Sequence, residues 1–274
     1  MALKAAMARD RVNLMGQHRS EQPAVLVVVH GSRNKEWVAQ QRHWFTNVRA
    51  AMKEIDPRVV MELSFLEITE PLFEDQFRAM SGRHSHVIIL PFFLVQGSHV
   101  MKDIPDIATR GLAPGGTYEL LRADGFAALL GANAEERLLA GKATPADDVI
   151  ACGYGSSRSN DHWHQLVADV RDHAGMFRDQ SWHWAATGHY LPDNAAPLRG
   201  KIEALRKEGK THLAILPLYL GISSYQTDLI PRIMNEFPDV QFHFSPTSIL
   251  PDQRLEKWAV EAITQALHSR SATR

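Results

Sequence analysis

Two histidines and one glutamate stand where this sequence could bind a metal ion. His30 directly follows the apolar run AVLVVV, Glu67 follows the apolar segment 59–66, and His99 lies in a glycine-containing loop after the run HVIIL. Imidazole and carboxylate groups both bind Fe, Co, Ni and Zn, and three such ligands leave a coordination position open. The residue types therefore indicate a site that binds a divalent first-row metal ion and can pass it on.

Each of these residues taken alone also fits a plain structural role. His30 could cap the following helix, Glu67 could be a solvated carboxylate at a strand end, and His99 could be an ordinary loop residue. Their shared location favours the functional interpretation, because ligands of open parallel sheets bind outside the carboxyl ends of the strands.

The elements that would position these residues alternate between strand and helix. Strand patterns cover 24–29, 59–66, 86–90 and 118–121, and helical spacing covers 35–55, 71–80, 104–110 and 126–139. Continuous β-branched runs are typical of strands buried on both faces of a parallel sheet, and their crossover connections are right-handed. The first half is therefore predicted to be an α/β lobe, a parallel sheet flanked by helices, closed by the helix at 126–139.

The second half repeats the first. VVVHGSRN matches IACGYGSSRSN, and HVIILPFFLVQGSHVMKDIPDI matches HLAILPLYLGISSYQTDLIPRI, with Pro91 and Pro217 126 residues apart (217 minus 91). A repeat of this length indicates duplicated domains, because solenoid periods are only about 20 to 50 residues. We predict an N-terminal extension at 1–22, a catalytic lobe at 23–142 and a degenerate second lobe at 147–274, facing each other across a cleft.

The second lobe lacks the candidate ligands. The replacements are Tyr154 for His30, Tyr225 for His99 and Asp193 for Glu67. Tyrosine is a poor ligand for a divalent ion at neutral pH, because its pKa is about 10. We expect no independent metal site in this lobe. It either forms the opposite wall of the cleft, with the tyrosines, Arg158 or Arg232 facing the ligand, or is purely structural.

A second histidine motif, His162-Trp163-His164, follows a glycine turn in the second lobe. Its position predicts the start of a helix, where residues two apart point in different directions. We therefore do not expect a metal site there.

Composition and missing motifs narrow the class of protein. The 274 residues carry a formal net charge of -1, with 45% hydrophobic and 22% charged residues, as in an ordinary globular protein without attraction to nucleic acid or anionic membranes. No stretch approaches the roughly 20 apolar residues of a membrane helix. One cysteine, Cys152, excludes an internal disulfide and fits a reducing compartment. No phosphate-binding glycine motif is found, so no nucleotide cofactor is expected. We expect a cytoplasmic monomer or homodimer.

The motifs resemble those of a known family. HGSR at 30–33, FLEITEP at 65–71 and PFFLVQGSHVMKDIP at 91–105 are similar to the sirohydrochlorin chelatases, the class II cobalt and iron chelatases of siroheme and cobalamin synthesis. The resemblance covers residues 23–141 well and the second lobe in degraded form. It implies a flavodoxin-like lobe, a metal ion held by His30 and His99, and assistance from Glu67.

The expected function is insertion of a divalent metal ion into sirohydrochlorin, with Co²⁺ as first choice and Fe²⁺ next. Histidine has a reference pKa near 6.5, so a largely neutral imidazole can bind the metal or accept a pyrrolic proton. His30 and His99 are thus the expected catalytic and metal-binding residues, supported by Glu67. The alternatives are a ferrochelatase for siroheme, a nickel chelatase, or a non-catalytic tetrapyrrole or metal carrier.

The chemistry of the expected substrate also indicates which residues would bind it. Sirohydrochlorin carries eight carboxylates, so its site should be wide and locally basic. Next to the motif loops we expect Ser32, Arg33, Gly97 and Lys102 to contact the substrate, because arginine and lysine pair with carboxylates. Lys35 and Arg110 are more simply explained as solvated surface charges.

Overall fold

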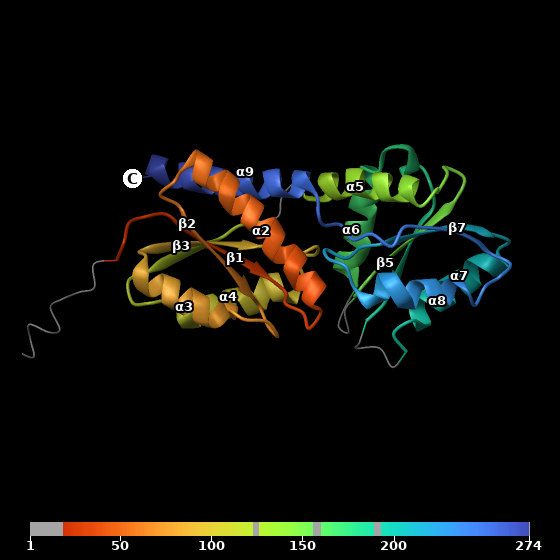
Figure 1. Cartoon of the computed structure of the whole chain (residues 1–274), viewed down its shortest axis with the longest axis horizontal. Coiled ribbons are helices and arrows are strands. Elements are labelled where there is room, and N and C mark those ends of the chain that lie inside the picture. The colour runs from red at the N-terminus through yellow and green to blue at the C-terminus, as the bar shows by residue number, and fades with distance from the viewer. Residues whose placement is uncertain (1–18, 123–125, 156–159, 189–192, 274) are drawn as a thin grey trace, which may run out of the picture.

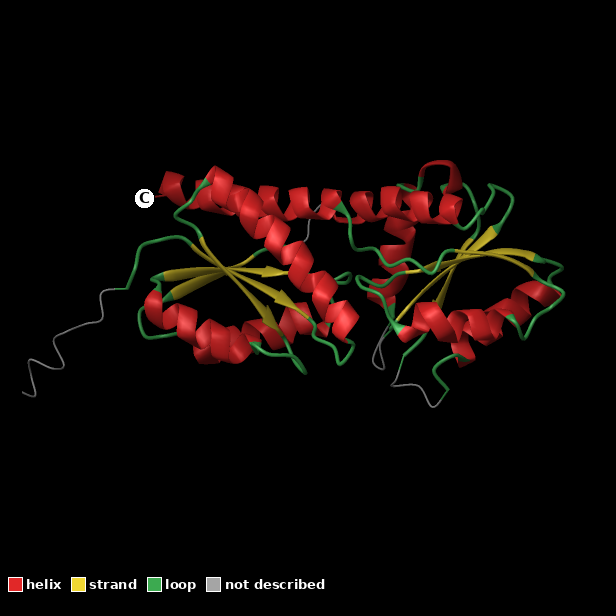
Figure 2. Ribbon diagram, viewed as in Figure 1, coloured by secondary structure: helices red, strands yellow, loops and turns green. Residues whose placement is uncertain are grey.

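The computed structural model describes residues 19–122, 126–155, 160–188 and 193–273. Two α/β lobes lie side by side, each with one parallel sheet between helices (Figures 1 and 2). The predicted two-lobed α/β fold is confirmed. Most of the predicted N-terminal extension lies outside the described residues, and Ser20 at its end forms a β-bridge with His84.

The first lobe follows the predicted order. Its elements are β1 (Ala24–Val29), α2 (Lys35–Ile55), β2 (Val60–Phe65), α3 (Phe73–Arg83), β3 (His86–Pro91), the π-helix η1 (His99–Asp103), α4 (Ile104–Gly111) and β4 (Thr117–Leu120). The parallel sheet has the order β2-β1-β3-β4. All six residues of β1 are buried, as the β-branched run predicts for a central strand.

The order of the strands determines where the candidate site lies. β1 lies between β2 and β3, so the chain leaves β1 toward one side and β3 toward the other. The crevice outside the carboxyl ends of two such strands is where doubly wound sheets bind ligands. His30 follows β1 and the loop leading to His99 follows β3, so both reach this crevice.

The second lobe repeats the pattern. Its elements are β5 (Asp148–Gly153), α6 (Asp161–Asp172), the 3-10 helix η2 (Gly175–Phe177), β6 (Trp182–Ala186), α7 (Ala196–Lys207), β7 (His212–Pro217), η3 (Tyr225–Leu229), α8 (Ile230–Met234) and β8 (Gln241–Phe244). The sheet order β6-β5-β7-β8 matches that of the first lobe. Even the π-helices correspond, since η1 begins at His99 and η3 at Tyr225. The predicted duplication is confirmed.

Two helices exchange places between the lobes. α5 (Phe126–Ala140) packs along α6 and against β7, whereas α9 (Gln253–Thr273), the last helix, packs along α2 and β3. Figure 1 shows α5 over the second lobe and α9 over the first. The expectation that 126–139 closes the first lobe is therefore wrong, although the helix itself lies where predicted. The domain boundaries 23–142 and 147–274 stay a prediction.

Hydrogen bonds fix the exchanged helix on the second lobe. Asn133 of α5 donates to Asp252 at 2.9 Å, and the buried guanidinium of Arg137 donates to Thr247. Burial lowers the pKa of Arg137 to about 10. Burial alone would raise the pKa of Asp252, but bonds from Arg254 and Asn133 hold it below its usual range. Leaving a buried charged group without its partner costs more free energy than losing an ordinary hydrogen bond. These contacts therefore favour the position of α5 on the second lobe.

One hydrophobic core runs through both lobes where the exchanged helices cross. The ring centroids of Phe126 in α5 and Trp258 in α9 lie 4.9 Å apart. Phe92, which follows β3, stacks on Trp44 with ring centroids 3.8 Å apart. These residues, one face of β1 and one face of β5 belong to one continuous cluster. The lobes are consequently held in a defined relation to each other.

Candidate functional site

The structure places His30 close to each of the other two predicted metal-site residues. The rings of His30 and His99 have centroids 5.1 Å apart, and Nε2 of His30 lies 3.4 Å from Oε1 of Glu67. Two imidazoles bound to one tetrahedral ion at about 2.1 Å would have centroids roughly 5 Å apart. Both histidine side chains are 41% exposed, so an ion can reach them from solvent. The pair thus has the separation needed to bind one ion.

A glycine lets Glu67 approach His30. Gly31 has a φ of 106°, and a Cβ atom there would lie 1.9 Å from the carbonyl oxygen of Glu67. Only glycine fits this backbone conformation and this close approach. The backbone N–H of Glu67 donates to the carbonyl of His30 at 3.1 Å. The HGSR motif is therefore explained by chain geometry as well as by its histidine.

Hydrogen bonds also join the two loops that follow β1 and β2. The backbone N–H of Ser32 donates to Oγ1 of Thr69 at 3.0 Å, and that hydroxyl donates back to the carbonyl of Ser32 at 2.9 Å. Next to Thr69, Ile68 has a φ of 68°, which is rare for a β-branched residue. Strain of this kind persists where surrounding contacts hold it, and Ile68 lies on the wall of the cleft.

His99 is oriented by Asp103. One turn of the π-helix η1 separates the two residues, and Nδ1 of His99 donates to Oδ2 of Asp103 at 2.8 Å. Because a carboxylate only accepts, this bond assigns the proton to Nδ1 and leaves Nε2 with a lone pair. Nδ1 of His30 likewise donates to the carbonyl of Gly31 at 3.1 Å. Both imidazoles can therefore present an Nε2 lone pair to a metal ion, and Nε2 of His30 does so beside Glu67.

Asp103 gives a direct test of this arrangement. We expect Asp103→Asn to weaken Co²⁺ binding about 10- to 100-fold, because outer partners of metal-binding histidines contribute that much to affinity. Isothermal titration with CoCl₂ measures the change at the cleft site, which is identified as the Co²⁺ binding that His30→Ala/His99→Ala protein loses. Asp106→Asn is the matched control, since Asp106 is exposed in the first turn of α4. Equal affinities for the two variants would show that Asp103 has no orienting role.

The histidine pair lies in a cleft of about 850 Å³ between the lobes. Most of the lining is apolar or aromatic. It includes Trp37, Phe92, Phe93, Leu94 and Val95 from the first lobe, and Trp163, Leu218, Tyr219 and Leu220 from the second. Cavities of this size with a few convergent polar groups are typical of small-molecule sites.

The predicted substrate contacts fall into two groups. Ser32, Arg33 and Gly97 line the cleft, but Lys102 is exposed on η1 and is not among the described lining residues. Arg33 is the one arginine or lysine among those described lining residues. Within the described part of the cleft Arg33 alone supports the expected local basicity, which stays a prediction. A flat ring needs apolar walls, and acidic groups at its edge can remain in solvent.

The second lobe forms the opposite wall, one of the two roles predicted for it. Tyr154 and Tyr225 line the cleft with ring centroids 5.4 Å apart, and burial raises the pKa of Tyr154. A neutral phenol supports the prediction that this lobe binds no metal at the positions equivalent to His30 and His99. Asp193 instead accepts from Ala195 and pairs with Arg199 at 2.7 Å. Of the predicted cationic contacts, Arg158 lies outside the described residues.

The second histidine motif lies at the start of a helix, as predicted. Helix α6 begins at Asp161, and only His162 of the two histidines lines the cleft.

Known proteins match both the sequence and the fold. The family model described as CbiX matches residues 24–139. A sirohydrochlorin cobaltochelatase from Methanosarcina barkeri is 32% identical over 105 residues, which cover 37% of this chain and 75% of that protein. One from Methanosarcina acetivorans is 34% identical over 92 residues, covering 32% and 65%. The sirohydrochlorin ferrochelatase of Bacillus subtilis is 32% identical over 88 residues, 32% of each chain. The last two matches span less than two thirds of the relatives' lengths.

Solved structures extend the likeness to both lobes. The sirohydrochlorin chelatase SirB from Bacillus subtilis subspecies spizizenii, in complex with cobalt, superposes with a TM-score of 0.64 at 17% identity, covering 89% of this chain and 94% of that one. CbiX, titled the terminal enzyme of siroheme biosynthesis in denitrifying bacteria, gives 0.58 at 16% identity, covering 89% and 99%. At these identities the structures show a shared fold.

Fold and site together define a two-lobed α/β protein of the chelatase type. Its first lobe carries the histidine pair, and its second lobe closes the cleft. Since a relative at 32% identity is matched over 75% of its length, this chain belongs to the sirohydrochlorin chelatase family.

Proposed function

We propose that this protein inserts a divalent metal ion, Co²⁺ or Fe²⁺, into sirohydrochlorin without a nucleotide. The observation that carries the proposal is the pair His30 and His99, whose ring centroids lie 5.1 Å apart at the wall of an apolar cleft. Each ring has its Nδ1 occupied by a protein acceptor, so both Nε2 atoms are available to a metal ion. The metal is a substrate, and two or three protein ligands leave room for ring nitrogens.

The reaction must remove two pyrrolic protons as the metal enters the ring. His30, His99 and Glu67 are the proposed acceptors, because an imidazole with a lone pair and a carboxylate can both act as general bases. Glu67 lies 3.4 Å from Nε2 of His30, close enough to stabilise that ring once it is protonated. Metal release and proton uptake are thus coupled on the same side chain, since protonated Nε2 no longer binds the ion.

The cleft fits a flat macrocycle with acidic substituents. Its volume of about 850 Å³ and its aromatic lining suit a ring plane. Arg33 lines the cleft, and its planar fork is suited to pair with a substrate carboxylate. Ser32 and Gly97 also line the cleft, and their contacts with the substrate, like that of Lys102, stay predictions.

The choice of metal rests on the relatives. Matched proteins are named cobaltochelatases and a ferrochelatase, so both Co²⁺ and Fe²⁺ are supported, with cobalt our first choice. No matched name mentions nickel, and the histidine and carboxylate ligands do not separate these ions.

Three features support a proposal for the working unit and its location. One chain supplies both walls of the cleft, which supports a monomer as the functional unit, with a homodimer as the alternative. Cys152 is buried, and burial raises the pKa of its thiol to about 12, so it is unreactive. Within the described residues, no helix combines the length and apolarity needed to cross a membrane. We propose that the protein acts in the cytoplasm.

Absorbance spectra under single-turnover conditions test the function. Purified protein is mixed with sirohydrochlorin and Co²⁺, Fe²⁺ or Ni²⁺, and the metallated product is followed against the spontaneous reaction. We expect Co²⁺ or Fe²⁺ insertion well above the uncatalysed rate without ATP. Tight binding of sirohydrochlorin with no acceleration for any metal would contradict an enzyme and favour a non-catalytic carrier.

A further inference from the structure

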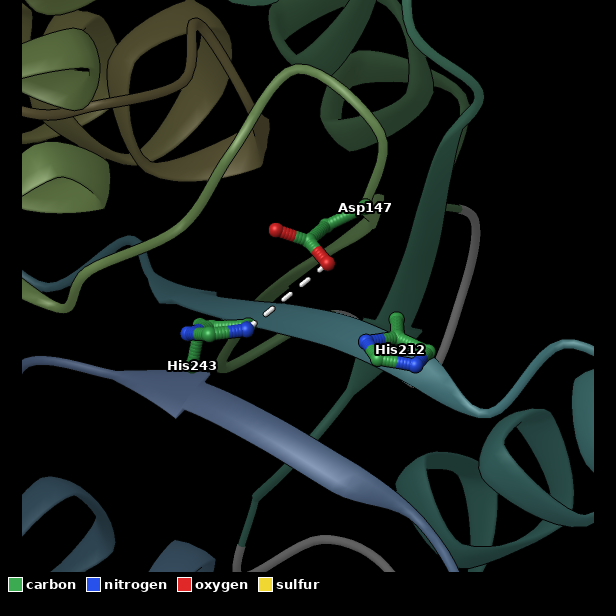
Figure 3. A group of neighbouring side chains, drawn as sticks. All are labelled: Asp147, His212 and His243. Carbon is green, nitrogen blue, oxygen red and sulfur yellow. Dashed lines mark ion pairs between the residues drawn. The ribbon is translucent and has the colours of Figure 1, made fainter.

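Three side chains meet at the end of the second sheet that lies away from the cleft. Asp147 directly precedes β5, His212 begins β7 and His243 lies in β8 (Figure 3). Leu218 and Tyr219 of the cleft follow the carboxyl end of β7, whereas His212 begins that strand. The cluster and the cleft therefore lie at opposite ends of the strands of this sheet. One ligand atom from each of the three residues lies within 4.8 Å of the others.

The carboxylate of the cluster is held in place and aimed at an imidazole. Asp147 is only 2% exposed, and its Oδ2 accepts from the backbone N–H and the hydroxyl of Thr144. Its Oδ1 lies 3.8 Å from Nε2 of His243, which is too long for a hydrogen bond (Figure 3). An ion about 2.1 Å from each atom fits that gap, so the two groups are spaced as metal ligands.

The two imidazoles are available as ligands. His212 is exposed at the start of β7. Nε2 of His243 accepts from the amide nitrogen of Gln241 at 3.3 Å, so this ring nitrogen carries a lone pair, and a bound ion would replace this long hydrogen bond. The nearby cation, Lys210, donates to Asp148 at 2.9 Å, and this ion pair offsets its repulsion of a bound ion.

We propose that Asp147, His212 and His243 bind one divalent transition-metal ion at this edge of the second lobe. Two imidazoles and one carboxylate suit Zn²⁺, Co²⁺, Ni²⁺ or Fe²⁺ and disfavour Mg²⁺ and Ca²⁺, which prefer oxygen ligands. The prediction of no independent metal site in this lobe was based on the two tyrosines, which lie at the other edge. Because the three ligands precede or belong to separate strands, a bound ion joins β5, β7 and β8 and stabilises the lobe.

Co²⁺ titration of a cleft variant tests this site separately from the proposed activity. In His30→Ala/His99→Ala protein, isothermal titration should show one Co²⁺ per chain, and Co²⁺ should raise the apparent Tm. Adding His212→Ala should weaken this binding at least about 10-fold and remove the Tm shift. His43→Ala, which removes an exposed imidazole from α2, should leave both unchanged.

His212 is the variant of choice because its exposed side chain can be removed without opening the core, whereas Asp147 is buried. Far-UV circular dichroism of the metal-free variants checks the fold. The proposal is wrong if the cleft variant binds no Co²⁺, or if the His212→Ala protein binds it as tightly as its parent. Neither result depends on whether the cleft catalyses metal insertion.

Discussion

Replacing either His30 or His99 with alanine should reduce the rate of cobalt insertion into sirohydrochlorin by about 10² to 10⁴ fold. The lower figure is typical of losing a positioned proton acceptor, and loss of a metal ligand adds to it. The ring centroids of His30 and His99 are 5.1 Å apart and both residues line the cleft, so the two histidines are expected to act as one unit. The double variant should therefore be little slower than the worse single variant. Single-turnover absorbance at saturating sirohydrochlorin measures all three rates.

His162→Ala is the matched control for these variants. His162 also lines the cleft, but it comes from α6 in the second lobe and is not paired with another cleft histidine as His30 and His99 are. Its removal should leave the insertion rate close to that of the wild type, and sirohydrochlorin binding should persist in every variant. Wild-type rates for both His30→Ala and His99→Ala would remove the roles assigned to them.

Trp258→Ala should destabilise the protein by about 3 to 5 kcal/mol, the usual cost of deleting a buried tryptophan side chain. Trp258 of α9 is 8% exposed, and the centroid of its ring lies 4.9 Å from that of Phe126 and 6.3 Å from that of Phe92. Its loss opens a cavity where the two exchanged helices cross the core. Urea unfolding measures the change in the free energy of unfolding. His268→Ala, on the exposed side of the same helix, should cost less than about 0.5 kcal/mol.

Hydrogen exchange of this variant also tests the helix exchange. If α9 covers the first lobe, Trp258→Ala should accelerate amide exchange in β1 and β3 more than in β5 and β7. A helix belonging to the second lobe, as its place in the sequence suggested, would give the opposite pattern. Faster exchange confined to β5 and β7 would contradict the observed packing.

Local patterns predicted the elements well. The run AVLVVV became β1 with the same bounds, and the helical spacing at 35–55 became α2, again with the same bounds. Elsewhere the ends moved by a few residues, as with the helix expected at 71–80, which begins at Phe73. Such agreement is expected because β-branched runs and helical periodicity act within a few residues of chain.

The sequence predicted those features of the site that depend only on the topology of the sheet. Parallel strands connected by right-handed crossovers end at one edge of the sheet, so His30, Glu67 and His99 had to be near one another. The orienting bond from Asp103 and the close approach at Gly31 were missed. A carboxylate four residues after a histidine was a usable signal for the first, since these positions share a helix face. Lys102 shows the limit of this reasoning: it adjoins the motif but is not among the described residues lining the cleft.

The sequence by itself determined the α/β class, the duplication and which residues of the first lobe are candidate metal ligands, because each follows from short-range patterns or from the order of the strands. Only the tertiary structure decided that α5 and α9 exchange lobes, that tyrosines of the second lobe close the cleft, and that Asp147, His212 and His243 meet. The physical reason is the same in all three cases. Periodicity shows which face of an element is apolar, but the partner of that face is selected by packing between residues far apart in the chain.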